Sequence, residues 1–317
     1  MTAWRLPVQL ETVLTWDYAP SAPRLRDLYE RAKQAQWNAS TDITWSLPVP
    51  FGSPLPDDSS FAMASFAVSP LARRGRSEWD RFRWELQAWM VSQVLHGEQG
   101  GLVVAARLVE AVPDLDSKYY AASQTADEAR HVEVFQRYLN EHVADPYPVN
   151  ESLRALIGDV ITESRWDMAA LGMQIMVEAL AMAVFRLAQQ TFHDDLIKEI
   201  TRLVARDEAR HVTFGVLSLS GVYPQLTAGE LAEREELVLE AAALMRRRFL
   251  LEDVWERLDV PRAEGVDYAA HDALMVKYRQ AIFAKVIAAL RQIGLLTPRV
   301  RDGLAALDLL DFGPGRL

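Results

Sequence analysis

The chain has 317 residues, a net charge of −10 and no cysteine, and this composition excludes several classes of protein. Disulfides, thiolate metal sites and cysteine nucleophiles are ruled out. No basic excess is present to neutralise phosphates, which argues against nucleic-acid binding. Half of the residues are hydrophobic, enough for a large soluble core in one or two domains. The N-terminus lacks a basic region followed by an apolar run, so we expect no signal peptide and a cytoplasmic protein.

Helical periodicity runs along most of the chain and no strand pattern appears, so an all-α fold is expected. A first helix is expected at residues 24–37, before a proline-rich loop at 38–58. The bundle is expected to begin at Ser77, a suitable N-cap with Asp80 three residues later. Four long helices are then predicted, at about 77–112, 115–142, 151–192 with a break near Ser164, and 195–222.

Three further helices are expected after the bundle, at about 227–258, 267–293 and from Pro298 onward. Thr227 and Glu230 form a capping box that opens the first of them. The end of the chain, 312–317, is expected to be frayed.

One segment, Met168–Phe185, is long and apolar enough to cross a membrane. Only Gln174 and Glu178 are polar within it. A helix that is apolar on all sides also fits the centre of a large soluble bundle. Because Glu178 falls at a position that an internal repeat demands, we interpret the segment as the central helix and expect no membrane association.

The sequence Asp-Glu-Ala-Arg-His-Val occurs twice, at 127–132 and at 207–212, an offset of 80 residues. Each copy lies within a predicted helix, where residues three positions apart share a face. A carboxylate beside an imidazole forms half of a transition-metal site. The pairs that project together are Glu128 with His131 and Glu208 with His211.

The other half of such a site is found by the same spacing. In a bundle with a two-metal centre, each Glu-x-x-His helix is matched by a helix that gives one more Glu. Glu98 lies 30 residues before Glu128, and Glu178 lies 30 residues before Glu208. Predicted turns lie midway in both halves, so antiparallel helices would bring the paired carboxylates level. The candidate metal ligands and catalytic residues are therefore Glu98, Glu128, His131, Glu178, Glu208 and His211.

With these motifs the sequence resembles the ferritin-like di-iron carboxylate superfamily, in particular its non-haem oxygenase and oxidase branch. The resemblance implies a four-helix bundle of two antiparallel helix pairs, with additional N- and C-terminal helices. The resemblance covers about 76–225, and we expect one domain over 1–317 with this stretch as its metal-binding core, an N-terminal extension (1–75) and C-terminal helices (226–317). It also implies outer contacts to the ligands from Asp127, Arg130, Asp207 and Arg210. An Asp–Arg pair within one helix is the other reading of these four residues, and both readings can hold.

Four carboxylates and two imidazoles suit iron, or iron with manganese, better than zinc. Their four negative charges neutralise two divalent ions. We therefore expect two iron ions, with a manganese–iron pair as the other option, and dioxygen as co-substrate. The expected partners are a small-molecule substrate and an external electron donor, and a homodimer is a further option.

Glycines surround the candidate ligand Glu98, at positions 97, 100 and 101. Each costs a helix about 1 kcal/mol relative to alanine, so the cluster requires a reason. Close helix packing and room for dioxygen or substrate are both open. Residues one turn from a ligand share its face, so we expect an apolar substrate pocket on the Glu98/Glu178 side. Its expected lining is Gly97, Gly101, Ala181 and Met182.

The residues that distinguish several known branches of the superfamily are absent. Phe135 stands in place of the radical tyrosine of the ribonucleotide reductase small subunit, and Gly101 and Met173 in place of the crosslinked pair of ligand-binding oxidases. Val204 stands where arylamine N-oxygenases have a third histidine, and Met182 where multicomponent monooxygenases have a threonine. None of these branches is matched at its diagnostic residue.

Two function classes remain open. The first is an oxygenase or oxidase that activates dioxygen to oxidise a small, partly apolar organic metabolite. The second is a ferritin- or rubrerythrin-like protein that handles iron or reduces peroxide. Those chains are usually shorter, and rubrerythrins add a cysteine-bound iron that a chain without cysteine cannot hold. The long additions around the bundle favour the first class, because a substrate pocket needs walls.

Overall fold

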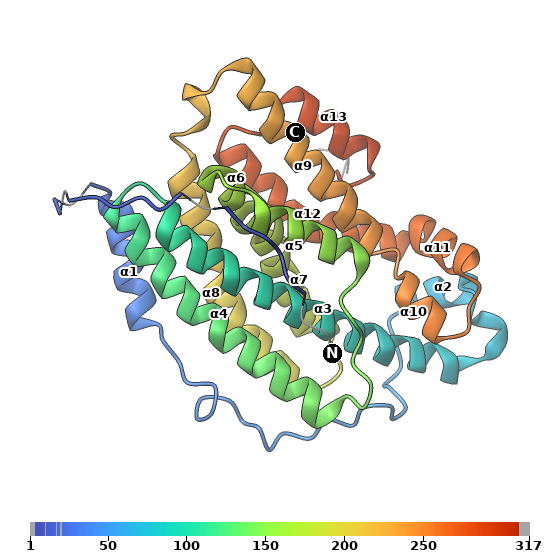
Figure 1. The fold of residues 1–317 in the computed structure, drawn as a ribbon. Helices are drawn as coiled ribbons and strands as arrows, with labels where there is room; N and C mark the ends of the chain where they lie inside the picture. Colours follow the sequence, from blue (N-terminus) through green and yellow to red (C-terminus); the bar gives the residue numbers. More distant parts are fainter. Residues whose placement is uncertain (1–3, 10, 17, 20, 311–317) are drawn as a thin grey trace.

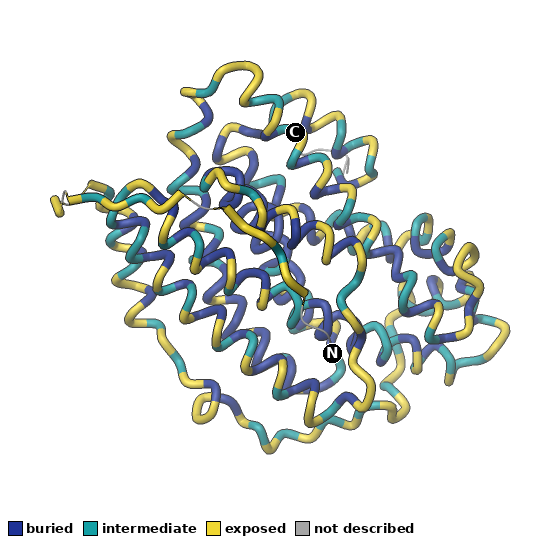
Figure 2. The backbone as a smooth tube through the Cα atoms, in the orientation of Figure 1, coloured by how far each residue is buried: buried dark blue, intermediate teal, exposed yellow. Residues whose placement is uncertain are grey.

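The structure is a computed structural model that describes residues 4–9, 11–16, 18–19 and 21–310. Every regular element within these residues is a helix and none is a strand. Long helices lie side by side at the centre, and shorter ones extend from one end (Figure 1). Burial is concentrated on the facing sides of the central helices (Figure 2). The expected all-α fold is confirmed, and the chain end expected to be frayed lies outside the described residues.

The first bundle pair consists of α3 (Arg76–Ala111) and α4 (Leu115–His142). The side chain of Asp114 caps α4. The N-cap expected at Ser77 is wrong, because α3 begins directly after Gly75. Gly75 has a φ of 96°, a conformation that glycine adopts readily, so the chain turns into the helix without a side-chain cap.

The second bundle pair consists of an interrupted helix and α8 (Asp195–Leu219). The interruption expected near Ser164 is present. A π-helical segment precedes Glu178, and π-helices are frequent at functional sites. Apolar periodicity did not predict this segment. The pieces of the interrupted helix are α5 (Glu151–Thr162), α6 (Trp166–Ala170), the π-helical η2 (Leu171–Val177) and α7 (Glu178–Thr191).

The apolar segment lies at the centre of the bundle. Over Trp166–Thr191 the chain is long and apolar enough to span a membrane, but 94% of its most apolar window is buried inside the protein. A membrane-spanning helix would present apolar faces to lipid, whereas these faces contact other helices. The segment therefore has the burial of a core helix.

The N-terminal residues cover one face of the bundle. α1 (Pro23–Gln34) packs across α4 and α8, so the residues that follow it reach both repeated segments. The expected loop after α1 contains no helix. A helix that the sequence did not predict, α2 (Ser60–Val68), is capped by the side chain of Ser59.

The C-terminal helices cover the other side of the second pair. The expected capping box is present at the start of α9, but this helix ends at Arg248 rather than near residue 258. Leu251 has a left-handed φ of 61°, which an α-helix cannot contain. The single helix expected at 267–293 is divided in two at Asp272. The C-terminal helices are α9 (Ala228–Arg248), α10 (Glu252–Arg257), α11 (Arg262–His271), α12 (Ala273–Gln292) and α13 (Pro298–Ala306).

Candidate metal centre

The six side chains expected to bind metal meet inside the bundle. They come from all four of its long elements, α3, α4, α7 and α8, and none is more than 6% exposed. Their ligand atoms form two overlapping groups, each of which could hold a metal ion. The groups are Glu98, Glu128, His131 and Glu208, and Glu128, Glu178 and His211.

The ligand atoms converge without satisfying one another. Around Nδ1 of His131 lie three carboxylate oxygens, from Glu98 at 3.0 Å, Glu208 at 3.2 Å and Glu128 at 3.5 Å. One imidazole N–H cannot donate to three carboxylates at once. Within the described residues, four of the ligand atoms have no hydrogen-bond partner: Nδ1 of His211, both carboxylate oxygens of Glu208 and Oε2 of Glu128. A cation at each convergence point would satisfy these atoms together.

The charge of the cluster also fits cations. Burial, together with the nearby Glu208 carboxylate, raises the pKa of Glu98 to about 8. Burial, with the charges of Glu128 and Glu208, raises the pKa of Glu178 well above its ordinary range. Burial disfavours the ionised form of a carboxyl group unless an opposite charge lies nearby. Two divalent cations would balance four carboxylates, so these residues fit a two-metal centre.

The Asp of each repeated segment contacts the His of the other segment. Nε2 of His131 lies 3.2 Å from Oδ2 of Asp207, and Nε2 of His211 lies 3.4 Å from Oδ2 of Asp127. A carboxylate at Nε2 orients the ring so that Nδ1 faces the cluster. Each Asp also pairs with the Arg three residues later, Arg130 or Arg210. Both readings of these residues therefore hold together.

Two outer contacts come from residues that sequence reasoning missed. Gln36 donates to Oδ1 of Asp127 at 2.9 Å, and the Trp37 indole N–H donates to Oδ2 of Asp207 at 2.8 Å. Gln36 and Trp37 lie 91 and 170 positions from these partners in sequence. No local pattern links them to the repeated segments, and only the packing of α1 on α4 and α8 reveals the contact.

A buried glutamine pair was also missed. Gln124 donates to Oε1 of Glu128 at 2.9 Å. It exchanges amide hydrogen bonds with Gln174 of η2, at 3.2 and 3.1 Å. Two signals could have found the pair: Gln124 lies one turn before a ligand, and Gln174 is one of two polar residues in the apolar segment.

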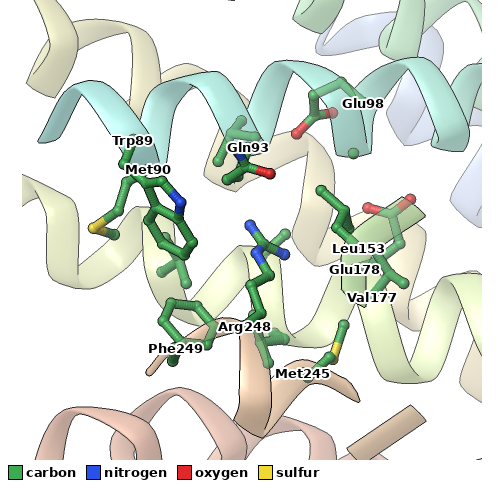
Figure 3. A pocket seen from close by; sticks show the side chains of 15 residues that line it. Trp89, Met90, Gln93, Glu98, Leu153, Val177, Glu178, Met245, Arg248 and Phe249 are labelled. Carbon is green, nitrogen blue, oxygen red and sulfur yellow. The ribbon is translucent and has the colours of Figure 1, made fainter. Parts of the chain in front are cut away.

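A narrow cavity, here called the inner cavity, ends at Glu98 and Glu178 and has a volume of about 30 Å³. Of the four residues expected to line a substrate pocket, Gly97 and Ala181 line it, whereas Gly101 and Met182 do not. Figure 3 shows Trp89, Met90 and Phe249 at its far end. The predicted side of the metal centre therefore has a cavity, with two of the four predicted residues in its wall.

The glycines around Glu98 have different reasons. A Cβ at Gly100 would lie 3.0 Å from Ile157, so this glycine allows close helix packing. A Cβ at Gly101 would lie 3.1 Å from Oε2 of Glu128, so it makes room for a candidate ligand. Gly97 faces open space. Close helix packing thus explains Gly100, and room beside a candidate ligand or in the cavity explains Gly101 and Gly97.

One cation in the inner cavity has no carboxylate within 4 Å among the described residues. The Arg248 guanidinium lies between the aromatic end and the Glu98/Glu178 end of the cavity (Figure 3). It lies 5.6 Å from the Trp89 ring centre, and its Nε is buried without a hydrogen-bond partner. Burial lowers the pKa of Arg248 to about 10, so the side chain stays charged at neutral pH. In the described part of the chain, the cavity thus contains a positive group that has no carboxylate in direct contact and feels the charge of Asp253 only from farther away.

Comparisons with known proteins add a family to this geometry. The family model described as p-aminobenzoate N-oxygenase AurF matches residues 21–294. A variant of an R2-like ligand-binding oxidase with an anaerobically reconstituted Mn/Fe cofactor is 17% identical, with a TM-score of 0.51 over 88% of this chain and 95% of that chain. The R2-like ligand-binding oxidase with an aerobically reconstituted Mn/Fe cofactor (long soak) is 16% identical, with a TM-score of 0.45 over 90% of each chain. No curated protein matches this chain.

The likeness to the first of these solved structures shows a shared fold and confirms the expected ferritin-like bundle. The family match spans all six candidate ligands. It also includes Val204 of α8, the position where arylamine N-oxygenases have a third histidine. The absence of this histidine is therefore a difference within the family and does not exclude the chain from it. The chain belongs to the p-aminobenzoate N-oxygenase AurF family and is an oxidoreductase of the ferritin-like di-iron carboxylate superfamily.

Proposed function

We propose that the six buried candidate ligands hold two iron ions, and that the protein uses dioxygen to oxidise a small, partly apolar organic acid. The observation that carries the substrate class is Arg248. An arginine buried without a carboxylate partner is costly unless a ligand supplies the negative charge. Arg248 is half-buried, with its Nε buried and unpaired, and it lies inside a cavity that ends at two of the candidate ligands.

The proposed substrate lies along the inner cavity. Its anionic group meets the Arg248 guanidinium, which forms its strongest hydrogen bonds with planar acids. Its oxidisable end faces Glu98 and Glu178, and its body packs against apolar walls such as Leu180 and Val184. The compound named in the family's description, p-aminobenzoate, carries an amine and a carboxylate at opposite ends of one ring, which matches this polarity.

The iron pair, when bound, supplies the electrons and the Lewis acidity for reducing dioxygen. The protein's own groups orient the candidate ligands and exclude water. Asp207 and Asp127 orient His131 and His211 through their Nε2 atoms, and the apolar walls exclude water. Full reduction of dioxygen takes four electrons, and a two-electron oxidation of the substrate supplies only two. We therefore propose an external electron donor; the cytoplasmic location and the homodimer stay predictions.

The proposal is tested on protein reconstituted anaerobically with ferrous iron and then exposed to dioxygen with p-aminobenzoate. Iron should saturate near two ions per chain, and uptake of dioxygen should depend on the acid. Arg248→Met should raise KM for the acid by roughly 10-fold or more, because a charge-assisted pair is lost. Arg248→Lys should restore part of the affinity, and Arg247→Met, next to it but exposed, is the matched control.

Two outcomes would contradict the proposal. Iron loading far beyond two ions per chain, without substrate oxidation, would favour the ferritin-like alternative. An unchanged KM in the Arg248→Met variant would show that the substrate's charge, if any, is bound elsewhere.

A further inference from the structure

The inner cavity is too small for the substrate that it is proposed to bind. Its volume of about 30 Å³ is close to that of one water molecule, whereas ligand sites are usually at least ten times larger. Binding of a substrate there therefore requires that part of its wall move. The question is which wall moves and where the substrate waits before it does.

A second and much larger cavity, here called the outer chamber, lies directly beyond the far end of the inner cavity. Its volume is about 460 Å³, within the range of small-molecule sites. The two cavities share Met90 and Phe249 and follow one another along α3. The α3 residues of the inner cavity fall within 89–98, and those of the outer chamber within 79–90.

Two of the helices that line the inner cavity, α3 and α7, also line the outer chamber. α7 contributes Glu178 to the inner cavity, and the end of α7 contributes Gln190 and Thr191 to the chamber. Met90 lies eight residues from Glu98 on α3, or about 12 Å at 1.5 Å per residue. The chamber and the candidate metal ligands are therefore separated by about two helical turns along α3.

Met90 and Phe249 are suited to form a gate. Methionine is flexible and adapts to changing neighbours. Phe249 directly follows the last residue of α9 and precedes Leu251, whose φ of 61° is unusual for a residue with a side chain. Such strain persists where the surrounding structure holds it, and it is concentrated at switch regions. Phe249 thus sits in a break between two helices, with a strained residue close behind it.

The chamber wall suits weak, transient binding of a partly apolar acid. Most of the wall is apolar, from residues such as Phe192, Leu274 and Met275. Nη1 of Arg83 is buried without a hydrogen-bond partner among the described residues, and the nearest carboxylate oxygen to it, from Asp80, lies 3.6 Å away. Asp58 lies 2.7 Å from the same guanidinium and neutralises much of its charge. Arg279, the other arginine of the wall, donates to the carbonyls of Ala269 and Ala270, so its donors are already used. The chamber would therefore attract an acid more weakly than Arg248 does.

We infer that the outer chamber is the vestibule in which the organic substrate first binds, and that Met90 and Phe249 form the gate between it and the metal centre. This inference rests on the proposed function, because it concerns the substrate of the same site. It assigns a binding site for a partly apolar aromatic or aliphatic acid about 12 Å or more from the candidate ligands.

The test measures how fast exogenous ligands of different size reach the iron. Azide is small, whereas benzohydroxamate has the bulk of a benzoic acid, and both give visible absorption bands when they bind ferric iron. Band formation is followed by stopped-flow on the iron-loaded, oxidised full-length protein. Ala62→Trp fills the chamber from α2, and Ala64→Trp, on the same helix but exposed and outside the chamber, is the matched control.

Ala62→Trp should slow benzohydroxamate binding by about 10-fold or more and leave the rate of azide binding unchanged. Ala64→Trp should bind both ligands at the wild-type rates. Phe249→Ala should speed benzohydroxamate binding by a similar factor. Met90→Ala makes the same test if Phe249→Ala does not fold. Normal azide binding with an unchanged benzohydroxamate rate in Ala62→Trp and in the gate variant overturns the vestibule alone. Protein that binds no iron and gives no azide band overturns the proposed function instead.

Discussion

The two halves of the bundle repeat the same six residues but differ one turn before each candidate ligand. Four residues before its two glutamates, the first half has Val94 and Gln124. At the same places 80 residues later, the second half has Gln174 and Val204. The order of valine and glutamine is thus exchanged between the halves. The two glutamines pair with each other across α4 and η2.

This exchange shows how a repeated framework can hold one centre with two different sides. Val94 lines the inner cavity, so the first half gives that cavity an apolar wall. Its counterpart Gln174 lies in the π-helical segment and belongs to a polar network beside Glu128. The repeat accounts for the candidate ligands, and the differences account for where a substrate fits. The four predictions that follow test this division, from the largest expected effect to the smallest.

The first prediction concerns ligands that both halves share. Glu128 belongs to both candidate metal groups, whereas Glu98 belongs to one. Glu128→Ala should therefore remove both metals and lower turnover by about 1,000-fold or more. Glu98→Ala should leave part of the metal content, and Glu110→Ala, exposed on the same helix as Glu98, should leave all of it. Metal analysis after reconstitution checks this, and equal loss from the Glu110 variant would refute the assignment.

The second prediction separates two glycines on α3. A Cβ at Gly101 already approaches Oε2 of Glu128 at 3.1 Å and Oε1 of Glu178 at 3.3 Å, so Gly101→Leu should displace these candidate ligands and lower metal content. Gly97 faces open space in the inner cavity, so Gly97→Leu should keep the metals and lower turnover by roughly 100-fold, because the cavity is filled. Metal content and turnover are measured for both. The contrast fails if Gly97→Leu loses metal and Gly101→Leu keeps it.

The third prediction concerns the crossed Asp–His contacts. Asp127→Ala and Asp207→Ala should each weaken metal affinity or turnover by roughly 10–100-fold, because an oriented imidazole is a better ligand. Asp207→Ala also leaves the Trp37 indole N–H without its acceptor, which makes it the more damaging of the two. Metal titration and circular dichroism check that affinity falls while helix content stays. Wild-type affinity in both variants would mean that these residues only form ion pairs with the arginines of their own helices.

Features that depend on residues close together in sequence were predicted well, whereas contacts between distant parts of the chain were not. The helix Leu115–His142 was predicted to the residue, and the six candidate ligands were found together, because both follow from local periodicity and an internal repeat. The contacts of Gln36 and Trp37 could not be predicted, because they depend on how α1 packs. The π-helical segment was missed because its apolar residues look the same in either helix type. Arg248 was missed because its position in the inner cavity depends on where α9 ends, which the sequence did not predict.

The last prediction tests the exchanged glutamines directly. Gln124 and Gln174 are both 1% exposed or less, so an amide that loses its partner stays away from water. Leaving a buried polar group unpaired costs about 1–3 kcal/mol, whereas removing both partners can be nearly neutral.

Gln124→Leu and Gln174→Leu should therefore each lower the free energy of unfolding by about 1–2 kcal/mol, and the double variant should lose less than the sum of the two. Chemical denaturation of the metal-free chain measures all four proteins. Removing the metals keeps the bond from Gln124 to Glu128 from altering metal affinity at the same time. Strict additivity would mean that the pair does not couple α4 to η2. The two halves would then differ at these positions without an energetic link between them.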